Sequence, residues 1–354
     1  MPRSFAGSHA PPPTPPALEG ERERARSFPG GGRILYWPGS ATGSFGRGIG
    51  IVEADGRQLT FSTPRGTFAY WNPGPSADIL TIDGKSRLPE ATSYRIEESG
   101  LEEADSWRLE SGLFAVFSSD GRWIAEPAFN SRGRMKEDVI RLVDRSTGEA
   151  SSYRVGLTPL AWAPDGRLIT IPWGGGDSML WNPLTGRTTA FVQRSRPELG
   201  EVIWSPDGSR FAADVWYGEH DSRSGIAIGT MRGELVAVSR HGRRFVRTPT
   251  WSPDSRRIAF IVRGLGRDGH RDSELITYDL ATERTTVVAR GVSDASWASW
   301  SPDGRWLLLD DWTRNRWLFV AADGSERIGY PRLGHFPRWC CPSSPPIDVP
   351  IPVC

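Results

Sequence analysis

Short apolar segments recur along most of this chain, and each is followed by a cluster of polar turn residues. Residues 257–262 (RIAFIV) are representative, and they lie directly after a Pro-Asp-Ser turn. Runs rich in Ile, Val and Phe that are bounded by Gly, Pro, Asp and Ser indicate β-strands. Almost no segment shows the 3.6-residue period of an amphipathic helix. The pattern therefore predicts an all-β protein.

The turns repeat as well, and their spacing predicts the architecture. Copies of one turn motif occur at Trp204-Ser205-Pro206-Asp207-Gly208, Trp251-Ser252-Pro253-Asp254-Ser255, Trp300-Ser301-Pro302-Asp303-Gly304, Trp162-Ala163-Pro164-Asp165-Gly166 and, more weakly, Phe117-Ser118-Ser119-Asp120-Gly121. In chain order, the Asp residues of successive copies are separated by 45, 42, 47 and 49 residues. A repeat of about 40–50 residues is the length of one four-stranded propeller blade.

Each residue of this turn has a physical role. Pro presets φ at the first central position, Asp tolerates the next one, and Gly accepts the positive φ that follows. The turn is preceded by apolar residues and followed by a new β pattern. We therefore expect it to join the innermost strand of each blade to the second strand.

A second repeat consists of apolar segments that we interpret as third strands. They are found at residues 49–56, 79–84, 139–144, 179–183, 226–230, 275–279 and 317–324. These seven segments favour seven blades. Only about 20 residues separate the first two, which is short for the strands expected between them, so six blades remain the alternative.

The two ends of the chain are expected to share one sheet. Phe336-Pro337-Arg338-Trp339 resembles one more innermost strand, and residues 33–61 can supply second, third and fourth strands. Closing the ring in this way removes exposed sheet edges. The prediction is a single β-propeller of four-stranded antiparallel blades, preferably seven, closed by its N- and C-terminal strands.

These repeats resemble the TolB-like, PD40 (WD40-like) family of β-propeller repeats, well over roughly residues 110–340 and loosely over 33–110. The resemblance implies a propeller scaffold and no particular activity, because propellers of this type serve different functions. Some relatives carry a hydrolase domain beside the propeller. This chain has no Gly-x-Ser-x-Gly motif, which such a domain would need.

We expect three regions: a Pro-, Gly- and Arg-rich tail at residues 1–32, the propeller at 33–341 and a Pro-rich tail at 342–354. The first tail has too few apolar residues to offset its ordering entropy. It also lacks the apolar stretch of a signal peptide, and no segment reaches transmembrane length. The sequence as written predicts a cytoplasmic protein, or an exported one if the true start lies upstream.

Composition narrows the classes of partner. The net charge is +1, so no overall field attracts nucleic acid or an anionic membrane, and no basic stripe or nucleic-acid-binding module is visible. Cys340, Cys341 and Cys354 are the three cysteines of the chain. Three thiols near one end do not form a disulfide framework, and we interpret them as reduced and incidental. We expect a monomer without a cofactor.

One face of the predicted ring is the better candidate for function. On it the loops between second and third strands are longer and differ from blade to blade, whereas the turns of the other face are short and regular. Irregular loops on a regular scaffold are typical of binding surfaces. Six aromatic residues and one arginine are expected to surround the channel there, at the ends of second strands: Trp37, Trp71, Phe129, Trp173, Trp216, Arg263 and Trp312. Exposed Trp provides stacking area at low entropic cost, although Trp is also often buried between blades.

Polar residues on the same face are weaker candidates. His220 and His270 lie in loops of neighbouring repeats, and Asp310 follows a second strand. Together they could form an acid–base pair. No His-x-His or His-Glu-x-x-His spacing supports metal binding, and we expect no metal site.

Three functions remain open, and one of them is a purely structural or regulatory part of a larger assembly. The favoured one is a non-enzymatic interaction module that holds a protein, peptide or glycan on its long-loop face. The alternative is a propeller enzyme, namely a lyase, hydrolase or isomerase, with its site at the channel mouth on the same face.

Overall fold

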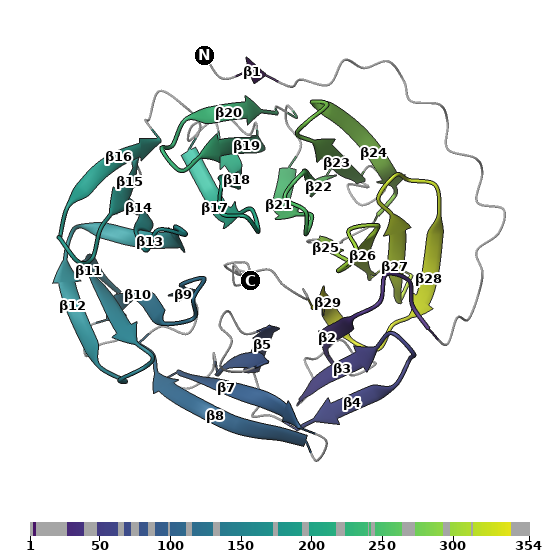
Figure 1. The fold of residues 1–354 in the computed structure, drawn as a ribbon, viewed down its shortest axis with the longest axis horizontal. Coiled ribbons are helices and arrows are strands. Elements are labelled where there is room, and N and C mark those ends of the chain that lie inside the picture. Colours follow the sequence, from purple (N-terminus) through teal and green to yellow (C-terminus); the bar gives the residue numbers. More distant parts are fainter. Residues whose placement is uncertain are drawn as a thin grey trace.

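The computed structural model is a ring of seven antiparallel β-sheets (Figure 1). It describes residues 3–4, 27–38, 48–62, 67–71, 78–83, 89–97, 100–110, 115–129, 135–172, 176–192, 198–216, 224–239, 241, 245–263, 273–292, 298–312 and 314–340. Every element in these ranges is a strand. The prediction of an all-β propeller is confirmed, with seven blades, and the six-blade alternative is wrong.

The first six blades use strands in chain order from the centre outward. Their strands are, for blade 1, β5 (Thr67–Trp71), β6 (Ile79–Asp83), β7 (Glu90–Glu97) and β8 (Gly100–Arg108); for blade 2, β9 (Val116–Phe117), β10 (Trp123–Phe129), β11 (Met135–Asp144) and β12 (Ala150–Arg154); for blade 3, β13 (Leu157–Trp162), β14 (Leu168–Pro172), β15 (Ser178–Trp181) and β16 (Thr188–Val192); for blade 4, β17 (Glu198–Trp204), β18 (Arg210–Trp216), β19 (Ser224–Thr230) and β20 (Leu235–Val238); for blade 5, β21 (Phe245–Trp251), β22 (Arg257–Arg263), β23 (Glu274–Asp279) and β24 (Arg284–Arg290); and for blade 6, β25 (Ala298–Trp300), β26 (Trp306–Asp311), β27 (Arg316–Ala321) and β28 (Arg327–Pro331).

The seventh blade, here called the closing blade, joins the two ends of the propeller as predicted. Its order is β29 (His335–Trp339), β2 (Arg33–Trp37), β3 (Ile49–Glu53) and β4 (Gln58–Phe61). Ile34 pairs with Trp339 and Leu35 with Arg338 across the closure. Main-chain hydrogen bonds therefore join β29, the innermost strand of the closing blade, to β2, its second strand.

The ordered ring begins before residue 33, where we had placed the end of the N-terminal tail. Phe28 is only 5% exposed and stacks on Phe319 with ring centres 5.7 Å apart. The Trp339 indole N–H donates to the Gly31 carbonyl at 2.8 Å. In addition, the short strand β1 (Arg3–Ser4) pairs in parallel with β20. Part of the expected tail thus packs on the propeller.

The repeated turns behave as their sequence predicts. In four of them the Ser Oγ donates to the Asp carboxylate, as between Ser301 and Asp303 at 2.6 Å. The same Oγ accepts the backbone N–H that starts the next strand, as from Trp306 at 2.9 Å. The residue after Asp has positive φ in each copy, 67° at Gly304 and 60° at Ser255, where the repeat lacks its glycine.

Neighbouring blades are joined by an indole hydrogen bond that also repeats. The Trp at the end of an innermost strand donates its Nε1–H to a carbonyl on the innermost strand of the preceding blade. The pairs are Trp162 with Val116, Trp251 with Ile203, Trp300 with Thr250, and Trp71 with Arg338, at 3.0, 3.2, 3.1 and 3.0 Å. This bond satisfies the buried indole N–H and fixes the height of one blade against the next.

One assignment in blade 1 was wrong. We interpreted residues 79–84 as a third strand and Trp71 as the end of a second strand. The sheet order β5-β6-β7-β8 makes β6 the second strand and β5 the innermost one. The sequence Trp71-Asn72-Pro73-Gly74 is in fact a degenerate copy of the Trp-Ser-Pro-Asp-Gly motif. This accounts for the short interval between the first two apolar segments.

Candidate functional site

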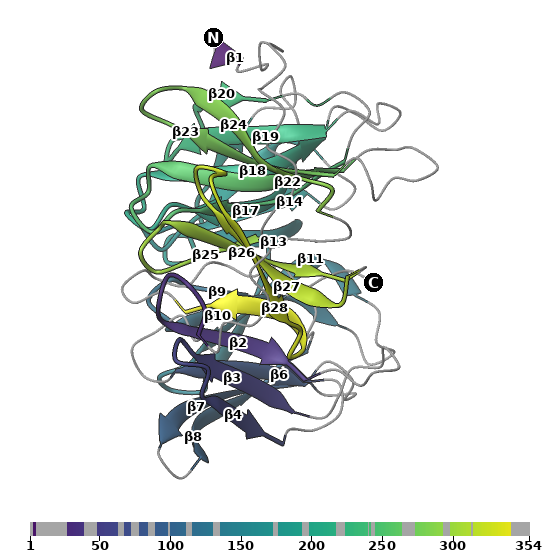
Figure 2. The same ribbon diagram turned by 90° about the vertical axis from the view of Figure 1, so that its right-hand side faces the viewer.

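The ring has two faces, which Figure 2 shows edge-on. We call the face where innermost strands end and turn into second strands the hairpin face. The loop face is the opposite one, where second strands end and where the chain enters the innermost strand of the next blade. Because consecutive strands are antiparallel, residues at the end of β26 and at the start of β29 meet on the loop face.

A buried ion pair lies at this meeting point, between blade 6 and the closing blade. Arg332 Nε is 2.9 Å from Asp310 Oδ1, and Arg332 Nη2 donates to Asp310 Oδ2 at 3.0 Å. The Phe336 backbone N–H donates to Oδ2 at 3.2 Å. Burial raises the pKa of Asp310, and the hydrogen bonds and charge of Arg332 oppose that rise. Asp310 Oδ1 and Arg332 Nε are close but form no hydrogen bond, so one charged hydrogen bond and the ion pair hold the guanidinium.

His335 completes the cluster and is only 4% exposed. Its Nδ1 lies 2.6 Å from Arg332 Nη2. A guanidinium has no acceptor, so Nδ1 must accept this hydrogen bond and the ring proton sits on Nε2. Burial, together with the positive charge of Arg332, lowers the pKa of His335 to about 4. The imidazole is therefore neutral at pH 7.

Trp312 covers this cluster from the solvent side. The guanidinium carbon of Arg332 lies 4.3 Å from the indole centre, and the His335 ring centre lies 4.6 Å away. Trp312 also donates a side-chain hydrogen bond to Asp310. With 37% of its surface exposed, Trp312 is a firmly held indole that still offers ring surface to a ligand.

Among the described residues, the charges next to Trp312 are positive on balance. Asp311, which is 2% exposed, accepts from both Arg314 and Arg316 at 3.2 and 3.1 Å. The side chain of Arg314 is 52% exposed. With the Asp310–Arg332 pair, three guanidiniums face two carboxylates next to one exposed indole. Anionic ligands are favoured at such a surface.

The structure places several predicted residues where they were expected. Trp37, Trp216 and Arg263 lie at the ends of second strands, on the same face as Trp312. Trp37 is 6% exposed and packs edge-on against Phe336 with ring centres 4.8 Å apart. Trp216 and Arg263 are half-buried. Trp37 therefore supports the Trp312 cluster from within the closing blade.

Other predicted residues lie elsewhere or outside the described residues. Trp71 ends an innermost strand and so lies on the hairpin face, where it joins two blades, because the strand order of blade 1 differs from our assignment. The backbone of Phe129 pairs with that of Met135, but its side chain is outside the described part. Trp173, His220 and His270 are also outside it. Their roles stay predictions.

Sequence reasoning missed Arg332 and His335. Both lie at the connection from β28 to β29, where no repeat motif marks a functional position. A signal was nevertheless present, because His335 directly precedes Phe336-Pro337-Arg338-Trp339, the segment that we interpreted as the closing innermost strand. The start of that strand has to reach the loop face next to Asp310.

No helix in the described residues is long and apolar enough to cross a membrane. No group of three or more His, Cys, Asp or Glu side chains in the same ranges is arranged to hold a metal ion.

Comparison with known proteins shows the fold of this chain but not its family. No protein-family model matches the sequence, and no curated protein does. Among solved structures, the periplasmic gluconolactonase of Pseudomonas aeruginosa is similar with a TM-score of 0.56 and 16% identity, over 91% of this chain and 100% of that one. Oligogalacturonate lyase from Vibrio parahaemolyticus has a TM-score of 0.55 and 13% identity, over 74% and 79%. TolB from Acinetobacter baumannii also matches, with a TM-score of 0.44, 18% identity, and coverage of 87% of this chain and 66% of TolB.

These matches correct our preferred function. The solved structures that resemble this chain with TM-scores above 0.5 include a lactonase and a lyase. The expectation of a non-enzymatic interaction module is therefore contradicted, and the enzyme alternative agrees better with the comparisons. No family model confirms the expected resemblance to the TolB-like, PD40 family, and what the structure itself shows is the propeller fold.

Proposed function

We propose that this protein is a propeller enzyme whose active site lies at the channel mouth on the loop face, around Trp312, and that its substrate is a sugar acid or the lactone of one. The observation that carries the proposal is an exposed indole held by a buried Asp310–Arg332–His335 cluster beside the exposed Arg314. Sugar acids are the chemistry named for the lyase and the lactonase that this fold resembles.

Trp312 and Arg314 are the residues proposed to touch the substrate. A sugar ring presents C–H groups that pack on an indole, and its hydroxyls stay exposed to water and polar side chains. Arg314 is the most exposed guanidinium of the cluster and can turn toward a carboxylate or a lactone carbonyl. Arg314 donates to Asp311 and to the Gly291 carbonyl from Nη1, which leaves its Nε and Nη2 groups for an anionic substrate.

Asp310, Arg332 and His335 are proposed as positioning residues. The ion pair holds the guanidinium beneath the indole, and Nη2 donates both to Asp310 Oδ2 and to His335 Nδ1. Phe336 has a φ of 53°, a conformation that costs a non-glycine residue energy and is found more often near functional sites. This preorganisation lets the site bind charge without first rearranging its own dipoles.

The test is a substrate screen on the full chain. Sugar lactones are followed by acid release in a pH-stat, and oligogalacturonate by the ultraviolet absorbance of an unsaturated product. We expect turnover with one of these classes and about a tenfold higher KM for Arg314→Gln, since a charged hydrogen bond is lost. Arg290→Gln is the matched control, because Arg290 is also exposed and pairs with one carboxylate, Glu274, at 3.0 Å. No turnover with either class, or equal KM changes in both variants, contradicts the proposal.

A further inference from the structure

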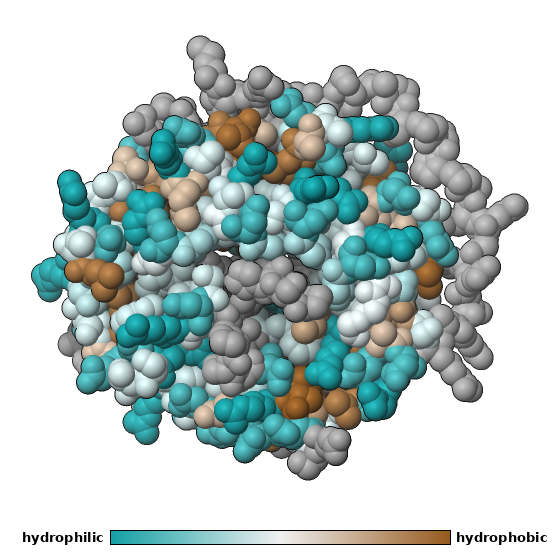
Figure 3. Space-filling model, in the orientation of Figure 1, coloured by the Kyte–Doolittle hydropathy of each residue, from teal (hydrophilic) through white to brown (hydrophobic). Residues whose placement is uncertain are grey.

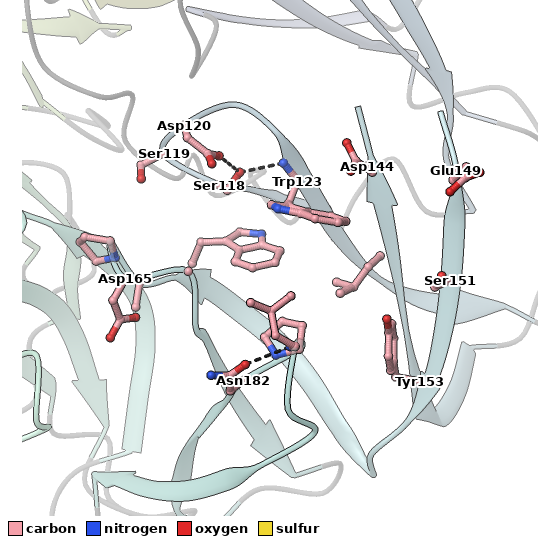
Figure 4. A pocket seen from close by; sticks show the side chains of 17 residues that line it. Ser118, Ser119, Asp120, Trp123, Asp144, Glu149, Ser151, Tyr153, Asp165 and Asn182 are labelled. Carbon is pink, nitrogen blue, oxygen red and sulfur yellow. Dashed lines mark hydrogen bonds between the residues drawn. The ribbon is translucent and has the colours of Figure 1, made fainter. Parts of the chain in front are cut away.

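A cavity of about 270 Å³ lies between blades 2 and 3 at the hairpin face, away from the Trp312 site (Figure 4). The β9–β10 and β13–β14 turns form one side of it, and the β11–β12 and β15–β16 turns form the other. Figure 3 shows a face of the molecule on which polar residues dominate and apolar ones are scattered in small groups. The volume suits one small organic group rather than a drug-sized ligand.

Aromatic side chains form the walls of this cavity. Trp123, Tyr153 and Trp162 all line it. Trp162 is fixed by its hydrogen bond to the Val116 carbonyl at 3.0 Å, and Tyr153 packs edge-on against Trp181 with ring centres 5.2 Å apart. Leu184, which is 89% exposed, lies on the rim. The walls are thus rigid, and an uncovered apolar side chain stands next to the opening.

The charges that line the cavity are all negative. Asp120 and Asp165 lie on one side of Trp123, and Asp144 and Glu149 lie on the other (Figure 4). No Lys or Arg is among the lining residues. Two arginines that do not line the cavity pair with two of these carboxylates: Arg122 lies 2.7 Å from Asp144, and Arg167 lies 2.6 Å from Asp165. Asp120 interacts electrostatically with the guanidiniums of Arg122 and Arg145, whereas Glu149 has no ion-pair partner among the described residues.

Arg122 already shows how these walls hold a guanidinium. Its Nε and Nη2 donate to Asp144 Oδ2 at 3.2 and 2.7 Å, while its guanidinium carbon lies 4.9 Å from the centre of the Trp123 ring. An indole face and a carboxylate together are a typical site for a planar cation. The same two chemical groups, an aromatic wall and a carboxylate, recur around the rest of the cavity.

We propose that this inter-blade cavity binds a guanidinium group supplied from outside the chain, either as a small free guanidine or as an arginine side chain of a peptide. The ligand cation would lie against the aromatic walls and bond to Glu149, and Asp120 would add a longer-range attraction from the other side of Trp123. A peptide would add an apolar contact to Leu184. This binding site is independent of the proposed enzyme activity, since it lies on the other face of the ring.

Isothermal titration calorimetry tests this with two probes, agmatine and the acetylated dipeptide amide of Arg-Leu. We expect saturable binding of agmatine that weakens as salt is added, and a lower Kd for the dipeptide if a peptide is the source. Glu149→Gln changes an exposed residue and should raise the Kd about fivefold, because one charged hydrogen bond is lost. Leu184→Ala should raise the Kd of the dipeptide and leave the Kd of agmatine unchanged.

A matched turn variant separates binding from folding. Asp120 and Asp254 both accept a Ser Oγ–H at 2.5 Å inside equivalent turns, but only Asp120 lines the cavity. Asp120→Asn should therefore weaken agmatine binding, and Asp254→Asn should leave it unchanged. The absence of saturation with either probe overturns the proposal, and so does a Kd that is unchanged by Glu149→Gln and Asp120→Asn.

Discussion

Nδ1 of His335 lies 2.6 Å from Nη2 of Arg332, so a buried imidazole accepts a hydrogen bond from a guanidinium that is itself paired with Asp310. The arrangement allows His335 to exist only as the neutral ring with its proton on Nε2. It also places a uniquely oriented guanidinium directly beneath the exposed Trp312 indole. The candidate site is therefore electrostatically preorganised rather than a chance meeting of polar side chains.

His335 should make the protein less stable in mild acid. Its pKa is lowered from 6.5 to about 4 in the folded state, so between these pH values the unfolded chain binds a proton that the folded chain does not. The free energy of unfolding should fall by roughly 2–3 kcal/mol as pH drops from about 6.5 to about 4. His335→Gln keeps an acceptor for Arg332 but cannot titrate. Urea unfolding at several pH values should show a smaller decrease in this variant, and identical decreases would contradict the assignment.

Asp144 should likewise lower the free energy of unfolding as pH falls, but in a lower pH window than His335. Hydrogen bonds from Arg122, together with those from Ser146, lower its pKa to about 2, so its contribution to stability is present above about 3.8 and is lost as pH falls toward 2. Asp144→Asn should reduce the free energy of unfolding by about 1 kcal/mol at pH 7, because Arg122 is half exposed and water screens the pair. The difference between variant and parent should vanish near pH 2. A difference that persists there would show that the effect is not ionic.

Truncation to alanine should cost much more unfolding free energy at Trp251 than at Trp216. Trp251 is 3% exposed and packs between blades 4 and 5, so Trp251→Ala should cost about 3–5 kcal/mol through the cavity that it leaves. Trp216 is half-buried at the end of β18, and its truncation should cost clearly less. Thermal unfolding of both variants decides this. Equal losses would mean that Trp216 belongs to the core.

Trp71 should contribute to stability through its indole N–H. Trp71→Phe retains a large ring but leaves the Arg338 carbonyl without its donor, at a cost of about 1 kcal/mol. Trp300→Phe should cost a similar amount, since its N–H bonds to the Thr250 carbonyl in the same way at 3.1 Å. Denaturant midpoints measure both. An unchanged denaturant midpoint in Trp71→Phe would argue against Trp71 as one of the indoles that join neighbouring blades by a hydrogen bond.

The fold was predictable because each blade repeats its own turn chemistry. Asp207, Asp254 and Asp303 occupy the same place in successive hairpins, and the spacing between them fixes the length of a blade. Ring closure followed from Phe336-Pro337-Arg338-Trp339, which reads as an innermost strand with no partner later in the chain. Blade 1 was misassigned at Trp71 because its turn has lost the Asp that made the other copies recognisable.

The site was predictable only in part. Trp312 was identified because it lies at a repeated distance from the turn, and Asp310 was noted only as a carboxylate near the same strand end. Arg332 and His335 could not be identified in that way, since they belong to a connection that has no counterpart in sequence among the other blades. Their contact with Trp312 depends on how blade 6 meets the closing blade, a relationship that arises from the whole ring. The pKa of His335 depends on the same burial.

The most direct test of the proposed active site is kcat/KM of Trp312→Ala on whichever sugar-acid substrate the screen identifies. We predict a decrease of about tenfold or more, because the stacking surface is lost. The assay is made well below the unfolding midpoint of the variant, since truncation also uncovers the Arg332 and His335 side chains that pack on the indole. An unchanged kcat/KM in a folded Trp312→Ala protein would contradict the placement of the active site on the loop face at Trp312.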